Sequence, residues 1–249
     1  MPNGTDLEPS EARGILIRRL AIANELHEDD LLALRHAPFY VESFEAGQLL
    51  VREGDRPSRC CVVVSGFLIR TKYARNDARR IVSVHIPGDI PDLHSLYLHV
   101  MDYNVAALSS AIVGFIPHEH LRFLLTRHPR LATAIYRESL LDAAIARSWI
   151  VSRGHDNALK RMAHLLSEVG RRLGEIGLRQ DNTFVLPMKQ LDLADALGLS
   201  LVHVNRVLRE MRMNYGVQFK NGTVTVADPA KLEELGDFDG ALLKARPGV

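Results

Sequence analysis

The segment Leu191–Met211, LDLADALGLSLVHVNRVLREM, constrains the fold of this chain more than any other. Apolar residues recur at helical spacing, with the small Ala194 suited to a close helix crossing, and Gly198 then permits the positive φ of a tight turn. Ser200 is a natural N-cap for a second helix. Its inner face would consist of Val204, Val207, Leu208 and Met211. The segment therefore predicts a helix-turn-helix, with an ordinary helical hairpin in a core as the alternative.

The outer face of the second helix is polar and basic, which favours DNA binding over the ordinary hairpin. It carries Asn205, Arg206 and Arg209. Between positions 201 and 220, four cations stand against Glu210 alone, a local charge of +3, whereas the whole chain has a net charge of +1. A basic patch on a neutral protein is typical of a protein that reads sequence as well as attracting phosphates.

The totals of the sequence exclude several classes of protein. A chain of 249 residues with 47% hydrophobic content can form two domains, each with its own core. Its two cysteines, Cys60 and Cys61, are too few for a four-cysteine zinc or iron–sulfur site within one chain. We expect them to be buried apolar filler, with a redox switch as the alternative. Met1–Asp6 lacks the apolar core of a signal peptide, and no run approaches a membrane span, so we expect a cytoplasmic protein.

The middle of the chain predicts a β-roll. Short β-prone runs alternate with turn residues such as Ala46-Gly47, Gly54-Asp55, Arg75-Asn76-Asp77 and Pro87-Gly88. The β-prone runs are Phe39–Phe44, Gln48–Arg52, Cys60–Thr71, Arg80–Ile86, Tyr103–Ser109 and Ile112–Ile116. Many short strands with regular turns are typical of a compact barrel or roll.

Helical patterns flank the roll, so the predicted class is α+β. One pattern runs from about 11 to 36, and a long helix is expected from Glu119 to about Ser152, ending at a hinge, Arg153-Gly154. Its broad apolar face holds Leu131, Ala134, Ile135, Leu141, Ile145 and Trp149. Such a helix can pack on its own roll and pair with a second copy. A further helix is expected from Asn157 to Leu173.

After the helix-turn-helix, Asn221-Gly222 between two β-prone runs predicts a hairpin. A hairpin beside the second helix makes a winged helix-turn-helix, in which Lys220 can reach a phosphate. The predicted domains are thus a roll at 11–118, a long dimerisation helix and hinge at 119–153, and a winged DNA-binding domain at 154–235.

This order of elements resembles the Crp/Fnr family of bacterial transcription regulators. LADALGLSLVHVNRVLREM is similar to the family pattern IAxxLGxSxxxVxRxLxxL. GQLLVREGDRPSRCCVVVSGFLIR is similar to the opening of the family's roll, with Gly47, Glu53-Gly54-Asp55 and Ser65-Gly66 at the expected turns. The resemblance implies a sensor roll, dimerisation through the long helix, and a winged domain that binds a two-fold operator on double-stranded DNA. It leaves RNA polymerase open as a partner and a small-molecule effector unknown.

The sensor departs from the family's cyclic-nucleotide binders. Those proteins carry a Gly-Glu-Leu turn and, about ten residues later, an Arg-Ser/Thr pair that holds the phosphate. Here the turn region is Gly88-Asp89-Ile90-Pro91-Asp92-Leu93 and the later region is Met101-Asp102-Tyr103-Asn104, with no Lys or Arg between Arg80 and Arg122. Burying a phosphate without a cation is costly, and Asp89, Asp92 and Asp102 would add repulsion. We therefore expect no cyclic AMP binding in the usual way.

The second helix of the helix-turn-helix also departs from the family pattern. Family members often begin it with Arg-Glu and place an arginine four residues after the Glu; here Leu201-Val202 replaces the pair, and Arg206 is retained. Arg206 suits guanine, Asn205 could read adenine, and Val202 can pack on a thymine methyl. The expected DNA-binding residues are Lys189, Ser200, Leu201, Val202, Asn205, Arg206, Arg209 and Lys220. Ser200 has the alternative role of capping alone, and Lys189 that of a solvated side chain.

Other chemistry has weaker signals. The roll contains His85, His94, His99, His118 and His120, but neither a cysteine nor clustered carboxylates complete a site, so no metal or cofactor is expected. No nucleophile elbow, HExxH or phosphate loop accompanies Asp92 and His94, which argues against an enzyme. A hypothesis of another class stays open: an effector-binding module whose winged domain docks a protein partner rather than DNA.

Overall fold

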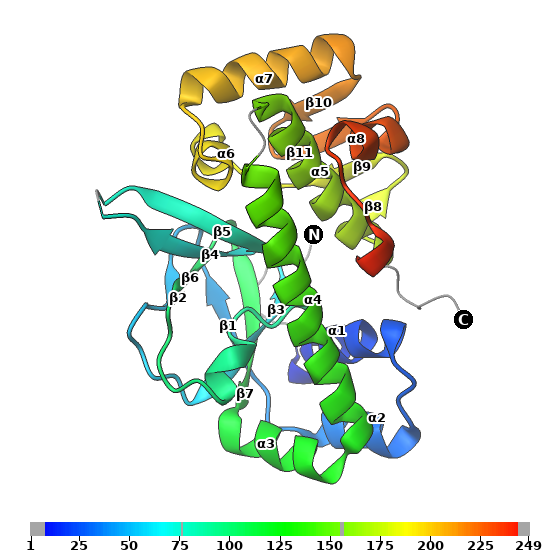
Figure 1. Cartoon of the computed structure of the whole chain (residues 1–249). Coiled ribbons are helices and arrows are strands. Elements are labelled where there is room, and N and C mark those ends of the chain that lie inside the picture. The colour runs from blue at the N-terminus through cyan, green and yellow to red at the C-terminus, as the bar shows by residue number, and fades with distance from the viewer. Residues whose placement is uncertain (1–7, 76, 155–156, 244–249) are drawn as a thin grey trace. The chain divides into compact units, whose positions relative to one another are not determined.

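The computed structural model describes residues 8–75, 77–154 and 157–243 (Figure 1). Met1–Asp6, and Asn76 of one expected turn, lie outside these ranges. The chain divides into two compact units. The first holds the residues up to Lys72 together with Ser83–Asp142, and the second holds Tyr73–Val82 together with the described residues from Ala143 onward.

The first unit contains the expected β-roll, built from two antiparallel sheets. Their strand orders are β1-β7-β3 and β2-β6-β4-β5. The strands are β1 (Tyr40–Phe44), β2 (Leu49–Val51), β3 (Arg59–Ser65), β4 (Leu68–Tyr73), β5 (Arg79–His85), β6 (Asn104–Ala107) and β7 (Ala111–Pro117). The turn expected at Ser65-Gly66 is present, because Gly66 has a φ of +77° and divides the β-prone run Cys60–Thr71 into β3 and β4.

The two cysteines show how the roll is packed. Cys60 belongs to the apolar cluster beneath α1, and Cys61 belongs to the cluster between the sheets. Adjacent residues on a strand point to opposite faces, and both thiols are free and buried. Burial raises the pKa of each thiol above its ordinary value. This confirms the prediction of buried filler and opposes reactivity, since the thiolate is the reactive form.

Helices cover the roll within the first unit. They are α1 (Pro9–Ala23), α2 (Glu28–His36), the short η1 (Leu93–Leu96), α3 (His118–Arg127) and the first part of α4 (Pro129–Arg153). The expectation of one helix from Glu119 to Ser152 is wrong, because the chain breaks at His128. Pro129 has no N–H to continue α3, and its fixed φ suits the start of α4.

The apolar face predicted for the long helix is the buried face of α4. Leu131, Ala134 and Ile135 pack into the core cluster that also contains residues of α1, α2 and β3. Trp149 is buried as well, whereas Leu141 and Ile145 are half-buried. The predicted face is therefore used inside the protomer, and α4 presents a different face to solvent.

The second unit is a winged helical domain. The helices are α5 (Ala158–Glu175), α6 (Gln190–Leu197), α7 (Leu201–Asn214), α8 (Pro229–Leu235) and the short η2 (Ala241–Leu243). Asn157 caps α5 by accepting from Leu159 N at 2.8 Å, which confirms the expected helix. The sheet, of order β10-β11-β9-β8, contains β8 (Arg179–Gln180), β9 (Thr183–Val185), β10 (Val217–Lys220) and β11 (Thr223–Val226). The sequence prediction missed β8, β9 and α8.

The last turns of α4 are fixed to α5 inside the second unit. Trp149 Nε1 donates to Glu168 Oε2 at 2.9 Å, and Ser148 Oγ lies 2.6 Å from His164 Nε2. Helix α4 ends at Arg153, as expected, but the division between the units falls earlier, between Asp142 and Ala143. In the part of the chain that the structure describes, no helix combines the length and the apolar content that a membrane crossing requires.

Candidate nucleic-acid interface

Helices α6 and α7 form the predicted helix-turn-helix. Gly198 ends α6 with a φ of +67°, and its N–H donates to Ala194 O. Ser200 then caps α7, because its hydroxyl accepts from His203 N at 3.3 Å. The capping role of Ser200 is thereby present, and its exposed position also leaves it near any DNA that α7 contacts.

The inner face of α7 packs as expected, with one difference. Val204, Val207 and Met211 are buried, whereas Leu208 is only half-buried. Leu208 instead lines an open groove of about 440 Å³, whose other residues are Pro187, Met188, Lys189, Gln190, Phe219, Asn221 and Gly222. The groove joins the start of α6 to the tip of the wing.

The outer face of α7 is open to solvent. Leu201, Val202, Asn205, Arg206 and Arg209 are all exposed, and 80% of the Val202 surface is accessible. Within the described ranges, neither arginine is paired with a carboxylate. Asn205 Nδ2 donates to Leu201 O at 3.1 Å, so its amide must turn before it can make a bidentate contact with adenine. The guanidinium groups are free to bind an anion or a base edge.

The wing is the hairpin that Asn221-Gly222 predicted. β10 and β11 pair with Lys220 opposite Thr223, and the φ values of the two turn residues, +51° and +73°, are those of a type I′ turn. Lys220 is exposed at the end of β10, and Lys189 is exposed where α6 begins. All eight predicted DNA-binding residues therefore lie in the second unit and are open to solvent.

The interior of the roll holds a cation that the sequence analysis missed. Arg70 on β4 is 8% exposed, and its guanidinium lies over the ring of Tyr103. Its Nε donates to Pro91 O at 2.7 Å, and its Nη1 donates to both carboxylate oxygens of Asp142 at 2.7 and 2.9 Å. Arg70 precedes Arg80 in the sequence, so it lies outside the stretch between Arg80 and Arg122 that contains no Lys or Arg. An arginine inside a strand that is buried on both faces was the available signal.

Carboxylates surround this cation. From the sequence, Asp89, Asp92 and Asp102 are expected to repel a bound phosphate. Asp89 and Asp92 are buried and so could act on a phosphate inside the roll, whereas Asp102 is 67% exposed and lies at the surface. Arg19 of α1 pairs with Glu138 at 3.0 Å and lies 3.8 Å from Asp89. Each cation of the interior thus already has a carboxylate partner.

The histidines of the roll are divided among separate surroundings. His85 bonds Ser83 at 2.8 Å, His94 bonds Tyr103 at 2.8 Å and His118 bonds Ser95 at 3.1 Å. Burial lowers the pKa of all three, so they are neutral at pH 7. His120 is half-buried and His99 is exposed. Among the described residues, no group of three His, Cys, Asp or Glu side chains could hold a metal ion.

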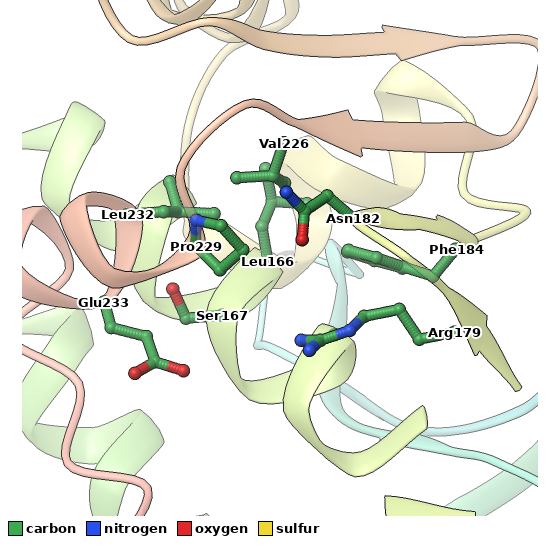
Figure 2. Close-up of a pocket in the computed structure, with 10 residues that line it drawn as sticks. Leu166, Ser167, Arg179, Asn182, Phe184, Val226, Pro229, Leu232 and Glu233 are labelled. Atoms are coloured by element: carbon green, nitrogen blue, oxygen red, sulfur yellow. The ribbon is translucent and has the colours of Figure 1, made fainter. Parts of the chain in front are cut away.

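Figure 2 shows a small cavity in the second unit, lined by residues of α5, β9 and α8 among others. The hydroxyl of Ser167 is buried beside it and has no hydrogen-bond partner in the described part of the chain. Its volume of about 20 Å³ is enough for about one water molecule. None of the predicted site residues lines this cavity, and it is too small for an effector.

Comparisons with known proteins agree with both halves of this description. A family model described as a cyclic nucleotide-binding domain matches residues 41–128, and one described as a Crp-like helix-turn-helix domain matches residues 160–235. The transcriptional activator protein FnrL of Cereibacter sphaeroides is 28% identical over 233 residues, which cover 91% of this chain and 92% of FnrL.

Two further proteins are similar. The nitrogen fixation regulation protein FixK of Bradyrhizobium diazoefficiens is 25% identical over 219 residues, 88% of this chain and 91% of FixK. The solved structure of FixK2 from Bradyrhizobium japonicum superposes with a TM-score of 0.70 at 21% identity, covering 80% of this chain and 97% of that one. The latter likeness supports the fold.

The buried Asp92 makes stability depend on pH. Burial raises its pKa from 3.8 to about 6, although Cys61 N donates to its Oδ1. Since the folded state binds this proton more tightly than the unfolded state, stability falls as pH rises from about 4 to 6, by roughly 3 kcal/mol in all. We expect Asp92→Asn to stabilise the protein, by about 1–2 kcal/mol more at pH 8 than at pH 5, in urea unfolding at fixed protein concentration. The exposed Asp102→Asn is the control; an equal gain for Asp92→Asn at both pH values would contradict the assignment.

Proposed function

The chain belongs to the Crp/Fnr family of DNA-binding transcription regulators, and we propose that it acts in the cytoplasm as a homodimer on a two-fold operator. The observation that carries the proposal is the open outer face of α7. Its arginines are exposed and unpaired within the described ranges. Lys189 lines the groove beside Leu208 of α7, and Lys220 is exposed at the end of β10, next to the groove residues Phe219 and Asn221. A helix with free guanidinium groups, flanked by cations, suits insertion into a major groove between two phosphate backbones.

The operator half-site should differ from that of the Arg-Glu members. Arg206 is free to make a bidentate contact with guanine O6 and N7. Val202 is the most exposed of the residues at the start of α7 and has no acceptor for a cytosine amino group. We therefore assign the guanine contact to Arg206 and a change of preferred base to the position that Val202 faces.

The dimer contact follows from the solvent face of α4. Thr133, Tyr136, Leu140, Ala143, Arg147 and Ile150 are spaced alternately by three and four residues, the spacing of a coiled-coil seam. Tyr136, Leu140 and Ile150 are 65%, 50% and 71% exposed, which is unusual for large apolar side chains on one helix face. A second copy of α4 would bury them. Two recognition helices about 34 Å apart could then enter successive major grooves.

The roll is proposed to have lost the cyclic-nucleotide phosphate site. Arg70, which would be the counter-ion of a buried phosphate, is held at two contacts by Asp142 and at a third by Pro91 O. A ligand would have to displace the Asp142 carboxylate and also approach the buried Asp89 and Asp92. Both steps oppose a phosphate.

One observation favours a second function. Leu201, Val202 and Met213 are exposed apolar residues on α7, and such residues are common where a protein docks. In that alternative, the winged domain binds a protein partner and the roll binds the effector. The flanking cations favour DNA.

Selection of duplexes from a random pool at near-physiological salt tests the DNA proposal. We expect a palindrome whose half-sites contain the guanine and differ from those of the Arg-Glu members, and Val202→Glu should shift the selected base. Arg206→Ala should reduce the preference for the selected operator over random duplex at least about tenfold. Arg212→Ala removes the same charge farther along the helix and should weaken binding to all duplexes alike. No enrichment by the wild type would favour the protein-docking alternative.

The dimer is tested by sedimentation equilibrium. Leu140→Glu places a charge in the seam and should convert the dimer to monomer, because an unpaired charge is costly to bury between helices. Ala146→Glu, also exposed on α4 but outside the seam, should leave the dimer intact. A dimer that survives Leu140→Glu would place the contact elsewhere.

The proposed loss of the phosphate site is tested by calorimetric titration with cyclic AMP at pH 7. We expect no saturable binding up to millimolar concentration. Asp142→Ala frees Arg70 and serves as the comparison; binding by this variant alone would assign the exclusion to the Arg70–Asp142 pair. Micromolar binding by the wild type would contradict the proposal.

A further inference from the structure

A β-hairpin that is far from the helix-turn-helix in sequence binds its first helix, α6, within the second unit. The segment Tyr73–Val82 contains the last residue of β4 and the first four residues of β5, and it belongs to the second compact unit. At the first residue of β5, Arg79 Nη2 donates to Asp192 Oδ1 at 2.6 Å and its Nε donates to Asp195 Oδ2 at 2.7 Å. Both carboxylates are on α6, so a single guanidinium spans one turn of the first helix of the motif.

The contact of Arg79 with Asp192 and Asp195, called the clamp below, is compatible with the capping of α6. The other oxygen of Asp192, Oδ2, accepts from Lys189 N at 2.8 Å, the bond by which a carboxylate at the third helical position caps a helix N-terminus. Each oxygen of Asp192 therefore has its own donor, and Arg79 does not compete with the cap. The side chains of Asp192 and Asp195 are 12% and 15% exposed, so the pairing is partly shielded from solvent.

Arg153 of α4 links the same hairpin to the other end of α6. Arg153 donates to Ile81 O on the hairpin and to Ala196 O at the end of α6, the latter at 2.9 and 3.1 Å. Arg161 of α5 donates to the neighbouring Leu197 O at 3.1 Å. The C-terminal carbonyls of α6 are thus held by cations, as favours a helix end.

The clamp leaves the reading face open. The outer residues of α7, including Val202 and Arg206, remain exposed while Arg79 binds α6. The hairpin therefore does not cover the DNA-binding surface. It fixes the helix against which α7 packs, and it neutralises two carboxylates that would otherwise repel the phosphates of a bound duplex.

We propose that Arg79 is a positioning residue for DNA binding, through which the hairpin 73–82 sets the placement of α6 and hence of α7. The inference rests on the DNA-binding function. Because β4 and β5 continue from this hairpin into the sheet of the roll, a ligand that shifts those strands would change the hold on α6. Through Arg79, a ligand bound to the roll could thereby change the affinity for the operator without contacting the winged domain.

Amide hydrogen exchange of the full-length protein without DNA tests the clamp. Arg79→Ala should accelerate exchange in α6, because it removes both ion pairs, and Asp195→Asn should do so to a smaller extent, because it removes one of the two carboxylate charges. Arg80→Ala is the matched control: it is the next residue, it removes the same charge, and its side chain donates only to Arg79 O among the contacts of the described chain. Unchanged exchange of α6 in Arg79→Ala would overturn the proposal.

Affinity for the selected operator, measured by fluorescence anisotropy, tests the consequence. Arg79→Ala should weaken binding roughly 3–10-fold relative to Arg80→Ala, and Arg79→Lys should recover part of the loss. A general loss of positive charge would affect Arg79→Ala and Arg80→Ala alike and would overturn the positioning role. If selection yields no operator, DNA reading itself has failed, and the exchange experiment still decides whether Arg79 holds α6.

Discussion

The left-handed turn at Gly198 is the constraint on which the DNA-binding surface depends. It ends α6 and redirects the chain into α7, and Ala194 of α6 and Val204 of α7 are both buried in the resulting arrangement. A Cβ at Gly198 would meet no atom within 4 Å, so the requirement for glycine comes from the backbone conformation and not from packing. Arg153 and Arg161 bind the carbonyls immediately before this turn and hold it in place.

The elements that the sequence predicted well are those with local causes. The cap at Ser200, the turn at Gly198 and the Asn221-Gly222 hairpin each depend on residues a few positions apart, and each forms as expected. One incorrect prediction, the single helix from Glu119 to Ser152, also has a local cause. Pro129 has no N–H with which to continue α3, so α3 ends before it and α4 begins.

The residues that the sequence did not reveal act across long separations. Arg70 binds Asp142, 72 positions away, and Arg79 binds Asp192, 113 positions away. Neither spacing has a periodic signature, and an arginine in a strand is ordinarily read as a solvated side chain. The seam on α4 had a different obstacle. Its residues can be separated from the core face only once Leu131 and Trp149 are known to be buried within the protomer.

The two ends of α4 are held by different parts of the protein, because Trp149 and Ser148 form hydrogen bonds with α5. Its last turns are part of the DNA-binding body, whereas its first turns are part of the core beneath the roll. The part of α4 from Ser148 onward must therefore move together with α5, because these side chains bond the two helices directly. A change in the direction of α4 between its first and last turns would then have to be taken up between Asp142 and Ser148, a stretch that includes the small residues Ala143, Ala144 and Ala146.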